Sequence, residues 1–421
     1  MTTVADVVSS DNMKQAWQQV RTNQGAPGID DMSIADSPDF ARTNWQGIKA
    51  SLLDGTYTPA PVKRVEIPKD TGGTRPLGIP TVSDRVIQQA ITQVLVPIFD
   101  PHFSESSFGY RPGRSAHQAI KKINELINQG YRYAVDIDLA KFFDNVNWDI
   151  LMSRVSRRIR DKGILKLIGK YLRAGVVING RVTQTTKGVP QGGPLSPLLS
   201  NILLDDLDKE LEKRGHQFCR YADDLIILVK SKRAGERVMQ SVTSFLEKNL
   251  KVQVNRNKSK VGPAESAIFL SFTFHLKRPT VSRKAFTNFK NELKRLTGRS
   301  WGVSMQYRYQ KIRTYLQGWM NYFGIGMRYN DAVEMDQRLR RRVRMCYWKQ
   351  WHRTRKRVGE LMKLGVSEHR AVSVGMSRKS YWHLAKNEAI NVGLSNAYLK
   401  EQGLTSIRTL WIKIHHPAMA R

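Results

Sequence analysis

The spacing of apolar positions follows two patterns along the first 274 residues, and each predicts one type of element. Apolar residues that recur on one helical face predict helices, and β-branched residues that alternate with polar ones predict strands. The predicted helices are residues 7–22, 42–54, 81–99, 114–129, 147–159, 162–174, 195–213 and 233–249. The predicted strands are residues 62–69, 74–79, 133–138, 218–221, 225–229 and about 251–255, with a hairpin at 175–187. This mixture predicts an α+β body, and it contains no G-x-G-x-x-G or Walker loop.

The pattern after about residue 280 is almost entirely helical. The predicted helices there are residues 284–297, 305–323, 331–350 and 353–364, followed by short helices and loops over 365–421. Arginines crowd residues 338–344 of this region. We expect these arginines to contact RNA phosphates, because no acidic partners stand near them in the sequence, although a solvated charged face is the alternative. Trp348 and Trp351 are expected to pack in the core.

The positive charge of the chain is concentrated in that helical region. The chain has 69 Lys and Arg against 36 Asp and Glu, a net charge of +33. Residues 275–421 hold 31 basic and 8 acidic residues, which is about two thirds of the excess. Such a charge predicts a polyanionic partner, and nucleic acid is favoured over a membrane surface because no lipidation motif is present.

The remaining composition narrows the class further. Cys219 and Cys346 lie far apart, which excludes a disulfide framework and a cysteine-based zinc module. No apolar run approaches 18 residues, and the N-terminus shows no signal peptide. We therefore expect an intracellular protein without a membrane span.

Two groups of carboxylates stand at predicted strand ends. Asp223 and Asp224 separate two apolar strands, and Asp138 ends another strand 85 residues earlier. The alternative to a functional site is that Asp223-Asp224 forms an ordinary solvated turn, because aspartate is common in turns. If the strands are neighbours, the three carboxylates could hold two Mg²⁺ ions that activate a 3′-hydroxyl and stabilise leaving pyrophosphate. Asp136 shares a strand face with Asp138 and is expected to play a supporting part.

Five motifs in order along the chain resemble the group II intron-encoded reverse transcriptases, or intron maturases. Each alone is weak, but the five together, which span residues 7 to about 360, are specific. The motifs are residues 23–30 (NQGAPGID), 108–114 (FGYRPGR), 190–197 (PQGGPLSP), 221–224 (YADD) with the Asp138 strand, and 318–323 (GWMNYF).

The resemblance implies a right-hand polymerase fold in four segments. Residues 1–60 would be an N-terminal extension, and 61–274 the fingers and palm with an antiparallel sheet. Residues 275–369 would be the helical thumb, or maturase domain X, and 370–421 a small basic DNA-binding segment. Because the sequence ends at Arg421 without a cysteine cluster, it looks like the bacterial class C proteins that lack an endonuclease domain.

The resemblance also implies a set of site residues. Asp138, Asp223 and Asp224 would be the catalytic, metal-binding carboxylates, with Leu139 joining them at the metal site. The incoming deoxynucleotide would be bound by Lys69, Arg75, Leu139, Phe143, Gln191 and Lys258. Nucleic acid would be bound by Arg111, Arg114, Gly192, Arg340, Arg341, Arg342 and Arg344.

Physical reasons accompany several of these assignments. Arg75 and Lys69 flank a predicted hairpin turn that can fold cations over phosphates. Phe143 would exclude a ribose 2′-hydroxyl, with an ordinary core phenylalanine as the alternative. The glycines beside Gln191 permit close approach of nucleic acid, and Ser196 is expected to cap the next helix. Ser271 departs from the family, which normally has glycine there in the primer-grip turn.

The implied activity is RNA-directed DNA polymerisation with two Mg²⁺ ions and deoxynucleoside triphosphates, on an RNA template with a DNA primer. The resemblance further implies a maturase that binds its group II intron RNA, promotes splicing, and retrohomes into target DNA. Such a protein would work in the bacterial cytoplasm as a ribonucleoprotein. Two alternatives stay open: a related reverse transcriptase recruited to host defence or DNA repair, and a splicing-only RNA-binding cofactor, which the intact carboxylates disfavour.

Overall fold

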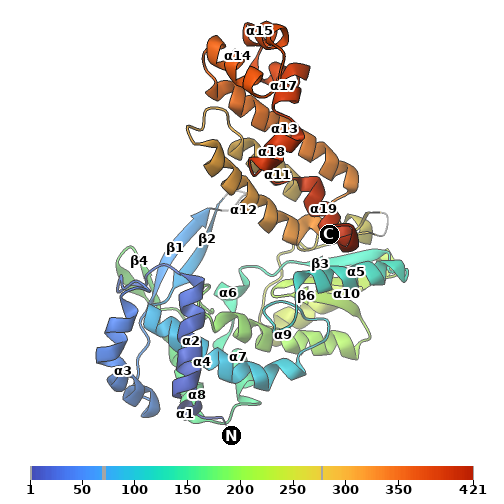
Figure 1. The fold of residues 1–421 in the computed structure, drawn as a ribbon. Helices are drawn as coiled ribbons and strands as arrows, with labels where there is room; N and C mark the ends of the chain where they lie inside the picture. Colours follow the sequence, from blue (N-terminus) through green and yellow to red (C-terminus); the bar gives the residue numbers. More distant parts are fainter. Residues whose placement is uncertain (1, 69–72, 276–277, 421) are drawn as a thin grey trace. The chain divides into compact units, whose positions relative to one another are not determined.

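The computed structural model describes residues 2–68, 73–275 and 278–420. The chain forms two compact units, Met1–Ala267 and Ile268–Arg421, and each has its own hydrophobic core. The first unit mixes helices and sheets, whereas the second is almost entirely helical (Figure 1). This arrangement confirms the predicted α+β class with an all-α appendage. The finer division into four segments stays a prediction.

The N-terminal helices of the first unit pack against one long helix. They are α1 (Val4–Val7), α2 (Ser10–Asn23) and α3 (Ser37–Leu53), and the long helix is α4 (Val82–Phe99). The single helix predicted over 7–22 is divided, because Ser9 takes an extended conformation and becomes the N-cap of α2. Gln93 of α4 donates to Asn12 Oδ1 at 2.7 Å, which ties α2 to α4.

A four-stranded sheet in the order β2-β1-β4-β5 lies beside these helices. Its strands are β1 (Val62–Pro68), β2 (Thr74–Ile79), β4 (Val176–Ile178) and β5 (Arg181–Thr183). Both hairpins are confirmed, and β4 joins β1 in parallel across more than a hundred residues of sequence. This sheet carries Arg75 on its hairpin strand β2.

A second sheet, in the order β6-β7-β3-β8, carries the acidic motifs. Its strands are β3 (Tyr133–Ile137), β6 (Gln217–Tyr221), β7 (Asp224–Val229) and β8 (Lys260–Pro263), all antiparallel. Helices α5 (Ala116–Asn128), α9 (Ser196–Lys213) and α10 (Lys232–Phe245) pack on it (Figure 1). The short helices α6 (Phe142–Asn145), α7 (Trp148–Ser156) and α8 (Lys162–Arg173) complete the unit.

The prediction of a strand near 251–255 is wrong. Its apolar alternation does bury Val252 and Val254, but the segment passes beyond the end of β3 and makes only a single bridge, from Val254 to Leu139. The edge of β3 is occupied instead by β8, which pairs with residues 133–136. The segment 251–255 is therefore buried and extended but does not pair as a strand of the sheet.

The second unit is built from nine helices in its described part. They are α11 (Arg283–Leu296), α12 (Met305–Phe323), α13 (Tyr329–Gln350), α14 (Thr354–Lys363), α15 (Glu368–Gly375), α16 (Tyr381–Leu384), α17 (Glu388–Gly393), α18 (Asn396–Glu401) and α19 (Ile407–His415). Phe289 and Trp319 stack in the core with ring centroids 4.0 Å apart. Trp348 is fully buried and Trp351 nearly so, which confirms the prediction that both pack in the core. No described helix is both long and apolar enough to cross a bilayer.

Ser271 lies in a two-residue hairpin turn near the start of this unit, and the geometry of the turn explains why the resembled family normally has glycine at this position. Phe269 and Phe272 exchange two backbone hydrogen bonds, of 3.0 and 2.9 Å, around Leu270 and Ser271. Both central residues have positive φ, 50° and 67°. Turns of this kind match the twist of a hairpin but favour glycine, because a Cβ strains the left-handed region. The serine is therefore accommodated at a cost in strain.

Replacing this serine should stabilise the protein. We expect Ser271→Gly to raise the free energy of unfolding by about 0.5–1 kcal/mol, because relief of left-handed strain outweighs the added chain entropy. Thermal or denaturant unfolding measures the difference. Ser367→Gly is the matched control, since Ser367 has a φ of −58° and should gain nothing. Loss of stability in Ser271→Gly would contradict the strain argument.

Candidate active site

The strand register brings the two acidic motifs together. Strand β3 pairs with β7 so that Ile137 lies opposite Leu225 and Asp136 opposite Ile226. Continuation of this register by one residue would set Asp138, which directly follows β3, opposite Asp224, the first residue of β7. Directly opposed residues of antiparallel strands have Cα atoms about 5 Å apart. The predicted convergence of Asp138 with the Asp223-Asp224 pair therefore follows from the sheet itself.

The carboxylates are close enough to perturb one another. Burial, followed by the negative charges of Asp223, Asp136 and Asp138 in that order, raises the pKa of Asp224 to about 6. Burial also raises the pKa of Asp136, with Asp138 adding to the shift while Lys260 opposes it. Carboxylates held together in this way favour a bound cation, because a cation removes their mutual repulsion.

Backbone contacts fix Asp138 at the strand end. Its N–H donates to Ser259 Oγ at 3.0 Å, and its carbonyl accepts from the Asn255 N–H at 2.8 Å. Lys258 lies in the same turn, with its Nζ 3.8 Å from Asp138 Oδ2. Leu139 follows directly and is buried. Lys258 is thus beside the acidic cluster, and its side chain is two-thirds exposed and can turn toward a ligand.

The donor set of this cluster fits a hard divalent cation. Every donor is a carboxylate oxygen, which Mg²⁺ prefers, and Mg²⁺ usually takes only one or two protein carboxylates together with waters and substrate phosphates. Across residues 2–68, 73–275 and 278–420, no three acidic, histidine or cysteine side chains are close enough to enclose one metal ion. Asp138, Asp223 and Asp224 are the residues that would hold such a cation, together with phosphate oxygens of a bound nucleotide.

The turn that presents Asp223 is fixed by a buried arginine. Ala222 has a φ of 58°, and a Cβ added to Gly109 would lie 2.3 Å from the Ala222 nitrogen, so this loop must carry glycine to pack against the turn. The guanidinium of Arg220 is fully buried and donates to the Ala222 carbonyl at 2.9 Å. The turn is therefore held from both sides.

All five N–H groups of Arg220 are satisfied. Nε and Nη2 form a bidentate pair with Asp208 of α9, and the shortest contact is 2.6 Å. Nη1 also donates to Asn201 Oδ1, and Nη2 to Ser107 Oγ, both at 2.8 Å. Asp208 is fully buried as well. A charged pair out of water is stable only when it is paired and hydrogen-bonded this completely.

A cavity of about 520 Å³ in the same unit contains several of the residues predicted to bind nucleotide. Arg75, Phe143, Gln191 and Gly192 line it, together with Tyr110. Arg75 Nε donates to Gln191 Oε1 at 2.9 Å, which links strand β2 to the glycine-rich loop. The Tyr110 ring lies 6.3 Å from the ring of Tyr221, which directly precedes the acidic turn, so this wall of the cavity is near that turn.

The packing of the glycine-rich loop explains its sequence. Gly78 of β2 donates its N–H to the Gln191 carbonyl at 2.7 Å, and a Cβ on Gly192 would lie 2.5 Å from the Gly78 oxygen. The prediction that Ser196 caps the next helix is wrong, because Leu195 holds the N-cap position of α9. The Ser196 hydroxyl instead donates to the Pro190 carbonyl at 2.6 Å and closes the loop.

Three other predicted residues have different outcomes. Lys69 lies outside the described residues. The prediction for Arg111 is corrected, because its guanidinium is buried and four of its five N–H groups donate to Asp100 Oδ1 and to the carbonyls of Asp100, Ser104 and Ser107. It therefore holds its own loop. Arg114 pairs with Glu105 yet stays partly exposed, and its contact with nucleic acid stays a prediction.

The arginine run of α13 is largely engaged within its own unit. Arg340 pairs with Asp336 one turn earlier, so the expectation of no acidic partner was wrong. Arg341 bonds the Trp382 carbonyl at 2.8 Å, and Arg342 bonds Thr297 Oγ1 at 2.5 Å. These three arginines are partly exposed, and RNA contact by them stays a prediction.

The prediction that Arg344 binds nucleic acid is corrected by its position. Arg344 is buried and donates to the Leu394 carbonyl and to Asn396 Oδ1, both at 2.9 Å. Burial lowers its pKa to about 10. These two contacts join α13 to the segment between α17 and α18, so Nε and one N–H of Nη2 are engaged inside the unit.

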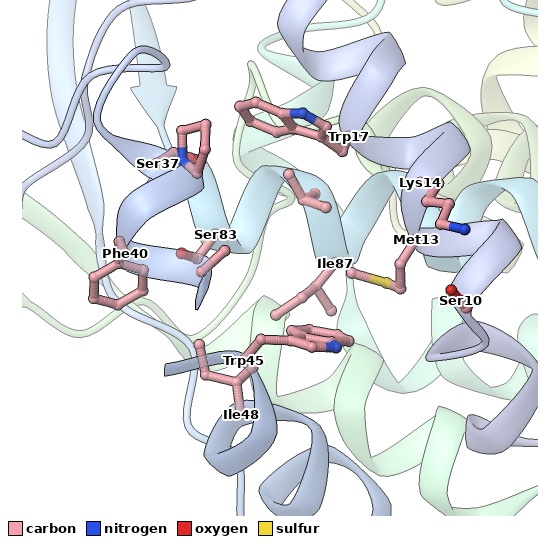
Figure 2. Close-up of a pocket in the computed structure, with 13 residues that line it drawn as sticks. Ser10, Met13, Lys14, Trp17, Ser37, Phe40, Trp45, Ile48, Ser83 and Ile87 are labelled. Carbon is pink, nitrogen blue, oxygen red and sulfur yellow. The ribbon is translucent and has the colours of Figure 1, made fainter. Parts of the chain in front are cut away.

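A separate apolar pocket of about 350 Å³ lies between α2, α3 and α4. Figure 2 shows Trp17 of α2 and Trp45 of α3 on opposite sides of it, with Ile87 of α4 in its wall. None of the described residues predicted for catalysis lines this pocket. This pocket is therefore separate from the acidic cluster and its polar cavity.

Comparison with known proteins identifies the family of the chain. Residues 67–274 match the family described as reverse transcriptase (RNA-dependent DNA polymerase), and residues 286–365 match the group II intron maturase-specific domain. Protein YkfC of Escherichia coli (strain K12) is 33% identical over 289 residues, which cover 59% of this chain and 76% of that protein. Group II intron-encoded protein LtrA of Lactococcus lactis subsp. cremoris is 31% identical over 331 residues, covering 62% of this chain and 55% of LtrA.

A solved structure titled partial Cas6-RT-Cas1--Cas2 complex is 26% identical, covering 58% of this chain and 42% of that one, with a TM-score of 0.38. That overlap is too loose to support an argument. The sheet, the acidic cluster and the two family matches define an RNA-directed DNA polymerase with an added maturase domain. The chain belongs to the reverse transcriptases that carry the group II intron maturase-specific domain. It spans about half the length of LtrA.

The buried arginine gives a testable positioning role. We expect Arg220→Met to lower the free energy of unfolding by about 3–5 kcal/mol, because Asp208 is left as an unpaired buried charge. Adding Asp208→Leu should restore most of the stability. The rate constant kcat for primer extension should fall in Arg220→Met and remain below the parent value in the double variant, because the Ala222 carbonyl lacks its donor in both.

The matched control is Arg214→Met on the same helix-to-strand connection. Arg214 pairs with Glu210 at 2.6 Å on the surface, and such pairs contribute at most about 1 kcal/mol. Its kcat should equal that of the parent protein. A double variant that polymerises at the parent rate would show that Arg220 does not position the turn.

Proposed function

We propose that this protein copies RNA into DNA at a two-metal site formed by Asp138, Asp223 and Asp224. The observation that supports the proposal is the register of β3 with β7, whose continuation would set Asp138 opposite Asp224. Two Mg²⁺ ions there would lower the pKa of the primer 3′-hydroxyl and neutralise the charge that develops on the phosphates. The substrates are deoxynucleoside triphosphates on an RNA template with a DNA primer.

The residues of the cavity have distinct roles in this proposal. Arg75, anchored through Nε to Gln191, keeps its terminal nitrogens for the triphosphate oxygens. Gln191 and Gly192 present backbone at the nascent base pair. Lys258, beside Asp138, is placed to neutralise the departing pyrophosphate. Each role is given to a residue that lines this cavity or belongs to the acidic cluster.

The second part of the proposal is a maturase activity. The maturase-specific match over residues 286–365 supports binding of a group II intron RNA that promotes its splicing. Reverse transcription of that RNA would then serve retrohoming into target DNA, in a cytoplasmic ribonucleoprotein. The charge of the last third of the chain supports a large polyanionic partner of this kind.

Removal of one carboxylate should abolish polymerisation. We expect Asp223→Asn to lower kcat for primer extension on an RNA template by about 1,000-fold or more, because metal-borne stabilisation of several kcal/mol is lost and each 1.36 kcal/mol is tenfold. Asp149→Asn, an exposed carboxylate on α7, is the control and should leave the rate unchanged. Undiminished synthesis by Asp223→Asn would refute the metal assignment.

Phe143 should set the choice of sugar. Its side chain is 6% exposed, lines the cavity, and is held edge-on by Phe142 with ring centroids 5.3 Å apart. We expect Phe143→Ala to reduce the preference for deoxynucleotides over ribonucleotides by about 10- to 100-fold, the value of a few kcal/mol of lost steric exclusion. The ratio of kcat/KM for the two nucleotides measures it. Phe142→Ala is the comparison variant, and an unchanged ratio in Phe143→Ala would leave Phe143 as an ordinary core residue.

A further inference from the structure

The second unit contains a cationic cavity that lies apart from the arginine run. It has a volume of about 740 Å³ and is bounded by α12, α13, α18 and α19 together with the loop before α19. Five of its lining residues are cations and one is an acid, Asp336. The cations are Arg313, Arg340, Lys400, Arg408 and Lys413. Polar hydroxyl and amide groups make up much of the remaining lining.

The single lining carboxylate is already saturated. Asp336 is 2% exposed and pairs with Arg340, and it also accepts hydrogen bonds from the Ile407 N–H at 2.8 Å and from Ser406 Oγ at 3.2 Å. These contacts fasten the start of α19 to α13. Asp336 is therefore a structural anchor and neutralises none of the other four cations.

Those four cations are exposed and have no carboxylate partner among the described residues. Arg313 donates to the Gly403 carbonyl at 3.2 Å, and Arg408 lies 5.9 Å from the centre of the Tyr329 ring. Lys400 and Lys413 have no ion pair in the described part of the chain. A concave surface lined by one sign of charge concentrates its field and binds ions of the opposite sign.

The size and composition of the cavity indicate the ligand class. Four uncompensated cations spread over three helices around 740 Å³ suit several phosphates in a row better than one small anion. Lysine and arginine beside hydroxyl and amide donors are the side chains that contact nucleic-acid backbones. We propose that this cavity, formed where α18 and α19 close on α12 and α13, binds successive phosphodiester groups of a nucleic acid.

This inference rests on the proposed function in one respect, that nucleic acid is the partner of the chain. It changes which residues make the contact: Arg313, Lys400, Arg408 and Lys413 carry it in place of the buried Arg344. Because backbone phosphates carry no sequence information, the cavity contributes affinity and orientation without selecting bases. RNA and DNA share this chemistry, so the test includes both.

The test is the salt dependence of binding, measured by fluorescence anisotropy with a short RNA duplex and with a DNA duplex of the same sequence. The variant is Lys400→Gln combined with Lys413→Gln, which keeps size and polarity at two exposed positions. Each phosphate contact contributes about 0.9 to the slope of log K against log salt for duplex DNA. We expect the double variant to lose about 1.5–2 from that slope on whichever nucleic acid occupies the cavity.

The matched control is Arg355→Gln combined with Lys356→Gln, two exposed cations of α14 outside the cavity. Its slope should equal that of the parent protein. An unchanged slope for the cavity variant on both duplexes, or an equal loss in the control, would overturn the proposal. Binding is measured without deoxynucleotides or Mg²⁺, so the result does not depend on whether the acidic cluster polymerises.

Lysine acylation of the unmodified protein gives an independent measurement. With the bound duplex present, Lys400 and Lys413 should be protected several-fold, whereas Lys356 should react equally with and without it. Equal reactivity of all three lysines in the presence of saturating duplex would also overturn the proposal. Failure of primer extension by the parent protein would instead refute the proposed function and leave this result intact.

Discussion

The buried pair of Arg220 and Asp208 is the interaction on which the candidate site depends. It joins α9 to β6, and through the Ala222 carbonyl it fixes the turn that presents Asp223 and Asp224. Two ions out of water are tolerated only with every donor and acceptor used, and all five N–H groups of Arg220 are used here. The adjoining loop completes the support, because Gly109 packs directly against Ala222. The turn beside the acidic cluster is thus held by contacts that involve none of Asp138, Asp223 and Asp224.

That rigid support explains how mutually repelling carboxylates can stand together. Burial and neighbouring charges raise the pKa of Asp224 to about 6, so the cluster costs free energy when it is fully ionised. The same repulsion favours a divalent cation, and the carboxylate donors match one. Strain elsewhere, at the positive φ of Ser271, shows that the fold accepts local costs where a tight turn is required. In each case the surrounding packing determines the conformation.

Much of this organisation could be predicted from the sequence, because its signals are local. The apolar periodicity placed the longer helices and both hairpins, and the two acidic strand ends indicated the candidate site. The helices α1 and α6 and the bounds of α15 to α19 were missed. The errors arose from tertiary contacts. The buried alternation of 251–255 could not show that β8 would take the edge of β3, and Arg111 and Arg344 could not be told from surface arginines. A charged Arg220 inside an otherwise apolar strand was the available signal for the buried network. Lys400 and Lys413 come together only when α18 and α19 fold onto α12 and α13.

The central claim is that Asp138, Asp223 and Asp224 hold divalent metal jointly with a bound nucleotide. The most direct measurement counts Mn²⁺ bound, by electron paramagnetic resonance, in the complex of protein, template–primer and a non-reacting deoxynucleotide analogue. The same complex of a variant with all three aspartates changed to asparagine supplies the background from nucleic acid and nucleotide. The account predicts two more ions bound by the parent protein than by the variant. Equal binding by the two proteins would contradict it.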